Sequence, residues 1–464
     1  MDPTTNRISL CSGGGSEQFI LQFDTSSTAN PTGYISAQGI DYDSDGNVYL
    51  QATSTAEVSG QQLTVAWSVN KTGTSIGWSK QFNYSGHTDT GASVRVNRNE
   101  SGEPVYMSGT SGNFVTYTTG SYADAQLYKF TTSGTTTWRT AWGGNGYDQW
   151  RGMDFDSSDN VYLTGTNYPW QSGIALVKKD SSGATQWHIK KNNSTTESSN
   201  FVSVDSNDNV YWAGIIHNPG DGWVGKYTTA GARTTSWTIS NNQDLLYGMD
   251  IDASNNLYVM IDNNGGWASI TGQSGTILQL NQNGNWTWAM VSGGTGNNYG
   301  YAICCDKSVA NGDVYGYSHA AASQFGNTYT AVYVCKRSYA GSVVWSRMFY
   351  KTTGNATFSG GTESIRCDGE YLYMTGDYTS GSIQRPFLIK YPVDGSVTGT
   401  FGEWKIDALT SGSNGFYAYD NNYLSSWSIG TGYESNTGTN GSDQTVQSTE
   451  STGNMITGDK EILS

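Results

Sequence analysis

A motif anchored by a tyrosine recurs seven times along the chain and constrains its fold more than any other feature. Clear copies are GIDYDSDGNVYLQAT (39–53), GMDFDSSDNVYLTGT (152–166), FVSVDSNDNVYWAGI (201–215) and GMDIDASNNLYVMID (248–262). With the weaker copies, the anchoring residues are Tyr49, Tyr106, Tyr162, Tyr211, Tyr258, Tyr315 and Tyr373. Their spacings of 47 to 58 residues leave room for about four short strands per repeat.

Each repeat has the pattern of two successive hairpins. The motif itself contains two alternating segments joined by Asp, Asn, Gly and Ser, which are the residues of tight turns. In the second hairpin a turn glycine stands four residues before a tryptophan, as in Gly134/Trp138, Gly183/Trp187, Gly284/Trp288 and Gly341/Trp345. The repeats show no helical period. Four antiparallel strands per repeat predict an all-β chain folded as a β-propeller.

The two ends of the chain decide the expected number of blades. Residues 415–430, GFYAYDNNYLSSWSIG, resemble another first hairpin with Tyr423 as its anchor, and residues 18–38 resemble the missing second hairpin. We therefore predict eight four-stranded blades in which the N- and C-terminal hairpins share the closing blade, since closure removes bare sheet edges. Seven blades are the alternative. The expected domains are an N-terminal docking segment (1–16), the propeller (17–430) and a polar flexible C-terminal arm (431–464).

Composition narrows the classes of function. The net charge of −15 disfavours a nucleic-acid partner and a polybasic membrane contact. No apolar run approaches the roughly 18 residues that span a bilayer, and the start of the sequence lacks a secretory signal pattern. Five widely spaced cysteines in 464 residues are too few for a disulfide framework and favour synthesis in a reducing cytoplasm.

Two resemblances extend this interpretation. The unit GMDFDSSDNVYLTGT, followed by an ALVKKD strand and G-x-x-x-W, resembles bacterial propeller repeats over nearly the whole chain, which implies fold but little about function. The opening MDPTTNRISLCSGGG (1–15) is similar to the first residues of marine, cyanophage-like tail-fibre and virion structural proteins. It departs from them in having Ile8, Leu10 and Cys11 before a pure glycine run.

The second resemblance implies a non-enzymatic phage virion protein. Such a protein would be tail-associated, made in the host cytoplasm and oligomeric in the particle. Its partners would be other virion proteins, with contact to a host-surface glycan as a secondary role. The alternative is a secreted or surface carbohydrate-binding propeller or a quinone-dependent enzyme, which the adjacent Cys304 and Cys305 suggest.

Neither catalytic residues nor an organic cofactor are predicted. The docking motif of quinoproteins has A-x-D-x-x-T-G-x-x-x-W, whereas Asp180 stands one residue too close to Gly183 and Trp187. The four histidines are scattered, and no nucleophile with a base and an orienting group can be assembled from the pattern.

Three pairs of aspartates are candidate ligands of a divalent cation such as Ca²⁺. They are Asp41 with Asp43, Asp154 with Asp156, and Asp250 with Asp252, each at i and i+2 on one face of a strand. The first pair does not start an EF-hand, because its twelfth position is Ala52 rather than a glutamate. The competing interpretation is that the second aspartate of each pair caps the hairpin turn.

Aromatic residues outside the strand pattern are candidate ligand-binding residues. Tyr168 and Trp170 lie in TNYPWQSG, and Trp267 lies in NNGGWAS. Such side chains stack on sugars when exposed. The alternative role is packing against a neighbouring blade or subunit.

Overall fold

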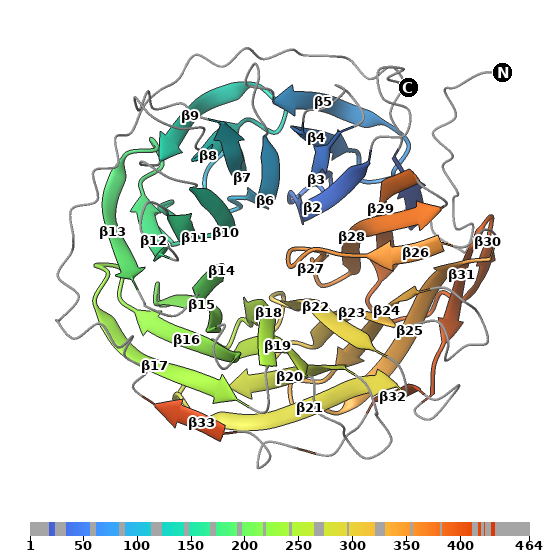
Figure 1. Cartoon of the computed structure of the whole chain (residues 1–464). Coiled ribbons are helices and arrows are strands. Elements are labelled where there is room, and N and C mark those ends of the chain that lie inside the picture. Colours follow the sequence, from blue (N-terminus) through green and yellow to red (C-terminus); the bar gives the residue numbers. More distant parts are fainter. Residues whose placement is uncertain are drawn as a thin grey trace.

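A computed structural model describes residues 18–431 apart from the segments 24–33, 56–61, 83–88, 113–122, 143–147, 168–172, 193–196, 217–219, 241–243, 264–272, 295–296, 321–329, 353–355, 381–382, 411–415, 419–421 and 423–427. The described residues form strands and turns, which group into seven sheets arranged as the blades of a β-propeller (Figure 1). They contain no helix that is long and apolar enough to cross a membrane.

In the first three blades the chain runs outward from the centre through four consecutive strands (Figure 1). Blade 1 contains β2 (Ile35–Tyr42), β3 (Val48–Ser54), β4 (Leu63–Val69) and β5 (Ile76–Phe82). Blade 2 contains β6 (Thr90–Val96), β7 (Val105–Gly112), β8 (Ala123–Phe130) and β9 (Thr136–Trp142). Blade 3 contains β10 (Gln149–Phe155), β11 (Val161–Asn167), β12 (Gly173–Lys179) and β13 (Thr185–Asn192).

The next three blades repeat this order. Blade 4 contains β14 (Glu197–Val204), β15 (Val210–Ile216), β16 (Asp221–Tyr227) and β17 (Arg233–Ser240). Blade 5 contains β18 (Asp244–Ile251), β19 (Leu257–Asn263), β20 (Ser274–Leu280) and β21 (Trp286–Gly294). Blade 6 contains β22 (Asn298–Cys305), β23 (Val314–Ala320), β24 (Ala331–Arg337) and β25 (Val343–Lys351).

The seventh blade closes the ring with a strand from the other end of the chain. Its inner strands are β26 (Ala356–Ser359) and β27 (Ile365–Cys367), which both pair with β28 (Tyr371–Ser380), followed by β29 (Ile383–Pro392). The outermost strand is β1 (Phe19–Gln22), antiparallel to β29 from Phe19 opposite Lys390 to Gln22 opposite Phe387. The prediction of eight blades is therefore wrong and the seven-blade alternative fits, because the N-terminal stretch supplies one strand to blade 7 and its next strand, β2, already belongs to blade 1.

The C-terminal hairpin that was expected to join this closing blade lies elsewhere. After β29 the chain forms β30 (Gly399–Phe401) and β31 (Trp404–Ala408), and β31 pairs with β25 of blade 6. It continues with β32 (Phe416–Ala418) on β21 of blade 5 and β33 (Ser428–Thr431) on β17 of blade 4. We call β31, β32 and β33 the belt, because they follow the outside of the ring blade by blade (Figure 1).

The recurring Asn-Val-Tyr-Leu pattern is explained by burial on both faces of each blade. Val161 and Leu163 pack in a cluster with Tyr106 of blade 2, whereas Tyr162 packs with Trp212 of blade 4. Burying a side chain of this size contributes roughly 1.5 to 3 kcal/mol. Because alternate residues face opposite neighbours, the motif joins three blades at once.

In five blades a tryptophan of the outermost strand binds the blade to the next one. Their indole N–H groups donate to backbone carbonyls of the following blade, in the pairs Trp78–Thr132 (2.9 Å), Trp138–Ser181 (3.0 Å), Trp187–Thr229 (2.9 Å), Trp288–Tyr339 (3.0 Å) and Trp345–Val393 (3.0 Å). The turn that receives Trp78 contains Gly134 at φ +86°, where an added Cβ would lie 2.8 Å from the indole. Phe19 of β1 takes the tryptophan's place against Gly73 of blade 1, where a Cβ would lie 2.6 Å from its ring.

Candidate functional site

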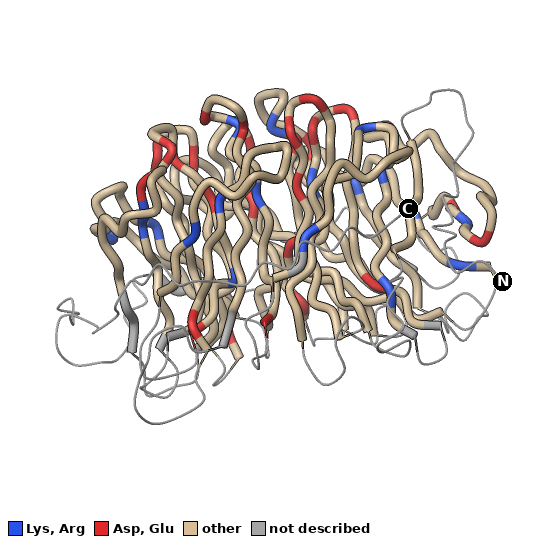
Figure 2. The backbone as a smooth tube through the Cα atoms, turned by 90° about the horizontal axis from the view of Figure 1, so that it is seen from above, with Lys and Arg blue, Asp and Glu red and all other residues tan. Residues whose placement is uncertain are grey.

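The second aspartate of each predicted pair holds the turn between the two inner strands of its blade. Asp43 accepts hydrogen bonds from the backbone N–H of Asn47 (2.8 Å) and the hydroxyl of Tyr49 (2.8 Å). Asp156 and Asp252 accept the corresponding bonds from the anchoring Tyr162 and Tyr258, both at 3.0 Å. These turns bring acidic residues together on one face of the disc (Figure 2).

The first aspartate of each pair belongs to a ring of equivalent positions around the centre. In every blade one residue of the innermost strand stands directly opposite the anchoring tyrosine in the strand register. These seven residues, which we call the central ring, are Asp41, Arg95, Asp154, Ser203, Asp250, Cys304 and Arg366.

The three aspartates of the central ring connect neighbouring blades. Asp41 accepts the backbone N–H of Val96, Asp154 that of Val204, and Asp250 that of Cys305, each at 2.8 Å. These bonds join blade 1 to blade 2, blade 3 to blade 4, and blade 5 to blade 6. Hydrogen bonds from an amide to an ionised carboxylate are stronger than bonds between neutral groups, so the central ring strengthens alternate junctions of the propeller.

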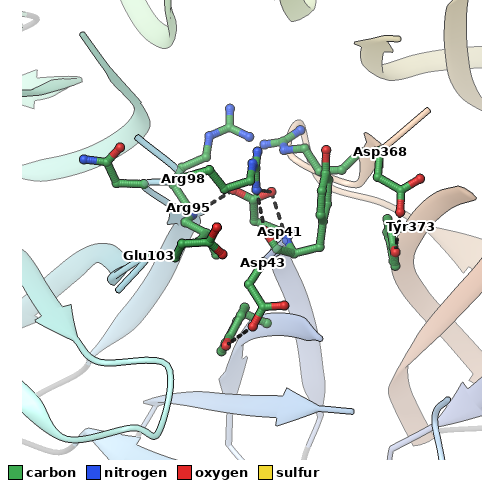
Figure 3. Close-up of polar contacts among 12 residues, drawn as sticks. Asp41, Asp43, Arg95, Arg98, Glu103, Asp368 and Tyr373 are labelled. Carbon is green, nitrogen blue, oxygen red and sulfur yellow. Dashed lines mark hydrogen bonds and ion pairs between the residues drawn. The ribbon is translucent and has the colours of Figure 1, made fainter. Parts of the chain in front are cut away.

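Basic side chains on the same face of the disc compensate the negative charge of these carboxylates. Arg98 pairs with Asp41 at 3.0 Å and lies 4.2 Å from the ring centre of Tyr42, while Lys307 pairs with Asp250 at 2.7 Å (Figure 3 shows Arg98 beside Asp41). Arg95 pairs at 2.9 Å with Glu363, a buried residue that also pairs with Arg366. A small cavity of about 60 Å³ lies between Arg95, Arg98 and Lys307, and a larger one of about 470 Å³ adjoins it and shares the lining residues Tyr42, Arg98, Lys307 and Cys367.

Burial and charge shift the titration of this cluster. Burial raises the pKa of the Asp154 carboxyl, although Lys307 and Arg95 oppose that change. The side chain of Lys307 is about half exposed, at 52%, and the carboxylates of Asp250 and Asp154 raise the pKa of its ammonium. Lys307 is therefore charged throughout the physiological pH range.

The structure assigns other contacts to the carboxylates that were predicted to bind a cation. Both oxygens of Asp41 already accept hydrogen bonds, from Arg98 and from Val96, and Asp43 is turned toward Asn47 and Tyr49. In the part of the chain that the structure describes, no three His, Cys, Asp or Glu side chains gather in a group that could hold a metal ion. The calcium site therefore stays a prediction.

The sequence did not single out the charged partners of the central ring. Arg98, Lys307 and Glu363 follow no repeat position that the motif makes visible. Arg95 and Arg366, by contrast, occupy the same repeat position as Asp41, opposite Tyr106 and Tyr373. Aligning all seven repeats at this position would have revealed them.

The adjacent cysteines face different neighbours. Cys304 packs in a cluster with Tyr315 and Cys367, whereas Cys305 packs with Tyr258 and Ile303. Burial raises the pKa of both thiols well above its usual range, which leaves them protonated and weakly reactive.

Several predicted site residues cannot be placed. Tyr168, Trp170 and Trp267, the candidate ligand-binding residues, lie outside the described residues. The same holds for the proposed docking segment 1–16 and for residues 432–464 of the C-terminal arm.

A buried carboxyl in blade 5 gives a prediction about pH. Asp262 is 3% exposed, its Oδ1 has no hydrogen-bond partner, and burial raises its pKa to about 7. The native state therefore holds a proton that the unfolded chain releases near pH 4, so this group favours folding at low pH and the benefit is lost as pH rises to 7. We compare the free energy of unfolding of Asp262→Asn with that of the unchanged chain. This difference should favour the variant more at pH 8 than at pH 5, by on the order of a few kcal/mol.

Urea unfolding of both proteins at the two pH values measures this difference. Asp377, whose pKa is also raised to about 7 by burial, titrates in both proteins and cancels in the comparison. An equal effect of the substitution at pH 5 and pH 8 would show that Asp262 does not titrate in this range.

The known proteins that this chain resembles are only distantly similar to it. No protein-family model matches the chain, and no curated protein sequence matches it. Similar solved structures include the phage phi92 endosialidase, with 11% identity and a TM-score of 0.42 over 89% of this chain and 76% of that one. Drosophila Plexin A in complex with Semaphorin 1b matches with 8% identity and a TM-score of 0.38 over 73% and 81%.

An exo-β-1,3-galactanase from Clostridium thermocellum matches with 10% identity and a TM-score of 0.29, covering 86% of this chain and 95% of the other. Identities of 11% or less with TM-scores of 0.42 or less transfer neither a family nor an activity to this chain. Its own strand order makes the chain a seven-bladed β-propeller, with blade-to-blade contacts at the described centre.

Proposed function

We propose that this protein is a structural component of a phage particle, associated with the tail, in which the propeller is a rigid scaffold for other virion proteins. This proposal rests on the contacts that the residues of the central ring make. Its aspartates bind backbone amides of the next blade, and its arginines pair with the buried Glu363. Charged side chains that are engaged in this way support a scaffold in which the blades are held rigidly together.

The acidic face of the disc supports the same function. Asp45 and Asp394 are exposed there on turns of blades 1 and 7, and Glu103 accepts the backbone N–H of Ser44 across the junction of blades 1 and 2 at 2.8 Å. Rigid turns with outward carboxylates suit the recognition of a basic partner surface. The opening MDPTTNRISLCSGGG, which resembles virion proteins, is the segment proposed to dock the disc in the particle.

Mass spectrometry of density-purified particles tests the proposal. The phage that carries this coding sequence is grown, its particles are banded, and the peptides of this chain are quantified against those of the major tail protein. We expect a fixed, stoichiometric ratio that persists after a high-salt wash. Absence of the chain from banded particles, with the protein present in the infected cell, would reject the proposal.

A further inference from the structure

The belt pairs with one blade after another, and three further blades follow along its path around the ring. β31 ends at Ala408, β32 spans Phe416–Ala418 and β33 spans Ser428–Thr431, so seven and nine residues separate the successive strands. Each is antiparallel to the outermost strand of its blade. The belt passes blades 6, 5 and 4 in that order, and the next outermost strand on its path is β13 of blade 3 (Figure 1).

In the described residues, β13 is the edge strand of its sheet. The order there is β10-β11-β12-β13, whereas the belt adds a fifth strand to the sheets of blades 4 and 5. An edge strand offers backbone N–H and C=O groups to any added strand. The tryptophans of the outermost strands show the same difference. Trp288 and Trp345, in blades that carry a belt strand, are buried, whereas the equivalent Trp187 of β13 is half-buried.

We propose that the outer edge of β13 is a docking site for residues 432–464 of this same chain, with residues 444–449 (QTVQST) forming the added antiparallel strand. This continues an interface that the belt has already formed three times. Residue 444 follows Thr431 after twelve residues, which exceeds the seven and nine that sufficed for the two earlier steps. Twelve residues span up to roughly 40 Å when extended.

Sequence and charge support this segment as the occupant. Three of the six residues in QTVQST are β-branched, which suits a strand, and the segment lies between Gly441 and Gly453 without an internal glycine or proline. The 33 residues from 432 to 464 carry a single basic residue, Lys460, and five acidic ones, Glu434, Asp443, Glu450, Asp459 and Glu461. Two of these acidic residues, Asp443 and Glu450, flank the segment directly, and the sequence of β13, TQWHIKKN, contains two lysines.

Hydrogen exchange of the backbone amides of β13 tests the proposal on the full chain. Val446→Pro removes an amide hydrogen from the middle of the added strand, and Thr437→Pro is the matched control in the preceding linker. We expect β13 peptides to exchange about tenfold faster or more in Val446→Pro than in the unchanged chain, because the edge opens. Thr437→Pro should leave them unchanged, and peptides of the distant β5 should not respond to either substitution.

Two further measurements separate this occupant from others. A chain that stops after Thr431 should lose the same protection of β13 while its melting temperature stays close to that of Val446→Pro. Equal exchange of β13 in all four proteins would overturn the proposal, as would an equal effect of the two proline variants. Protection that disappears on tenfold dilution of the unchanged chain would assign the edge to a second copy and would likewise overturn it.

Discussion

A chain that begins at residue 34 is expected to lose its ring closure and to melt about 10 °C below the full-length protein. This truncation removes β1 and with it Phe19, Ile20, Leu21 and Phe23, all of which are buried. At roughly 1.5 to 3 kcal/mol for each side chain, their loss amounts to about 6 to 12 kcal/mol. The truncation also bares the edge of β29 and leaves Gly73 without the Phe19 ring that fastens blade 7 to blade 1.

The control for this experiment is a chain that begins at residue 18 and therefore keeps β1. It should melt with the full-length protein, which separates the effect of the strand from that of the preceding residues. A synthetic peptide of residues 18–23, added to the chain that begins at residue 34, should recover part of the lost stability by pairing with β29. Melting of the shorter chain within a degree or two of the full-length protein would contradict this account of closure.

Gly165→Ala is expected to destabilise the protein by about 3 kcal/mol or more. β10 bulges between Trp150 and Gly152, and the bulge brings the carbonyl of Gln149 over β11. A Cβ at Gly165 would lie 1.8 Å from that carbonyl oxygen and 3.0 Å from Cα of Trp150. Both are backbone atoms, so relief requires the innermost strand of blade 3 to move and with it the hydrogen bond of Asp154 to blade 4.

Gly222→Ala is the matched control, because it also places a methyl group within a strand. An added Cβ at Gly222 would lie 3.5 Å from Cβ of Leu246, which is ordinary van der Waals contact. Denaturant unfolding should therefore show a change of less than about 1 kcal/mol for Gly222→Ala. Similar values for the two variants would show that β10 yields without cost and would refute the explanation by backbone overlap.

The sequence predicted the repeated unit better than it predicted the ends of the ring. Within a repeat the contacts are local, and the residues that make them recur in every copy, as in the Asp156–Tyr162 bond that caps one hairpin. At the ends the same residue types pair with strands hundreds of residues away, such as Leu21 with Leu388. An alternating pattern specifies which face is buried but not which partner is bonded, so one terminal strand was mistaken for a hairpin.

The C-terminal residues were misassigned for the same reason. GFYAYDNNYLSSWSIG has the composition of a first hairpin, yet β32 and β33 pair with different blades and not with each other. Nothing in their local sequence distinguishes a hairpin from two separate edge strands.

Only some of the contacts at the centre of the propeller could be predicted from the sequence. The pairing of Asp41 with Asp43 suggested a shared ligand, because strand geometry places residues i and i+2 on one face. The first aspartate instead bonds to the next blade and the second to its own turn. The arginines that neutralise the cluster come from repeats in which the motif is weakest, so a search for similarity passes over them.

The central ring and its neighbours also explain how the closing blade is held. Aspartates in blades 1, 3 and 5 bind the amides of blades 2, 4 and 6, and Arg95 of blade 2 donates to the carbonyl of Met153 in blade 3. At the seam where the chain closes, Asp377 of blade 7 accepts the backbone N–H of Ala37 in blade 1 at 2.7 Å. Glu363 of blade 7 forms a bridge to Gly39 of blade 1 and pairs with Arg95 of blade 2. Charged groups of the last blade therefore tie it to both of the first two blades.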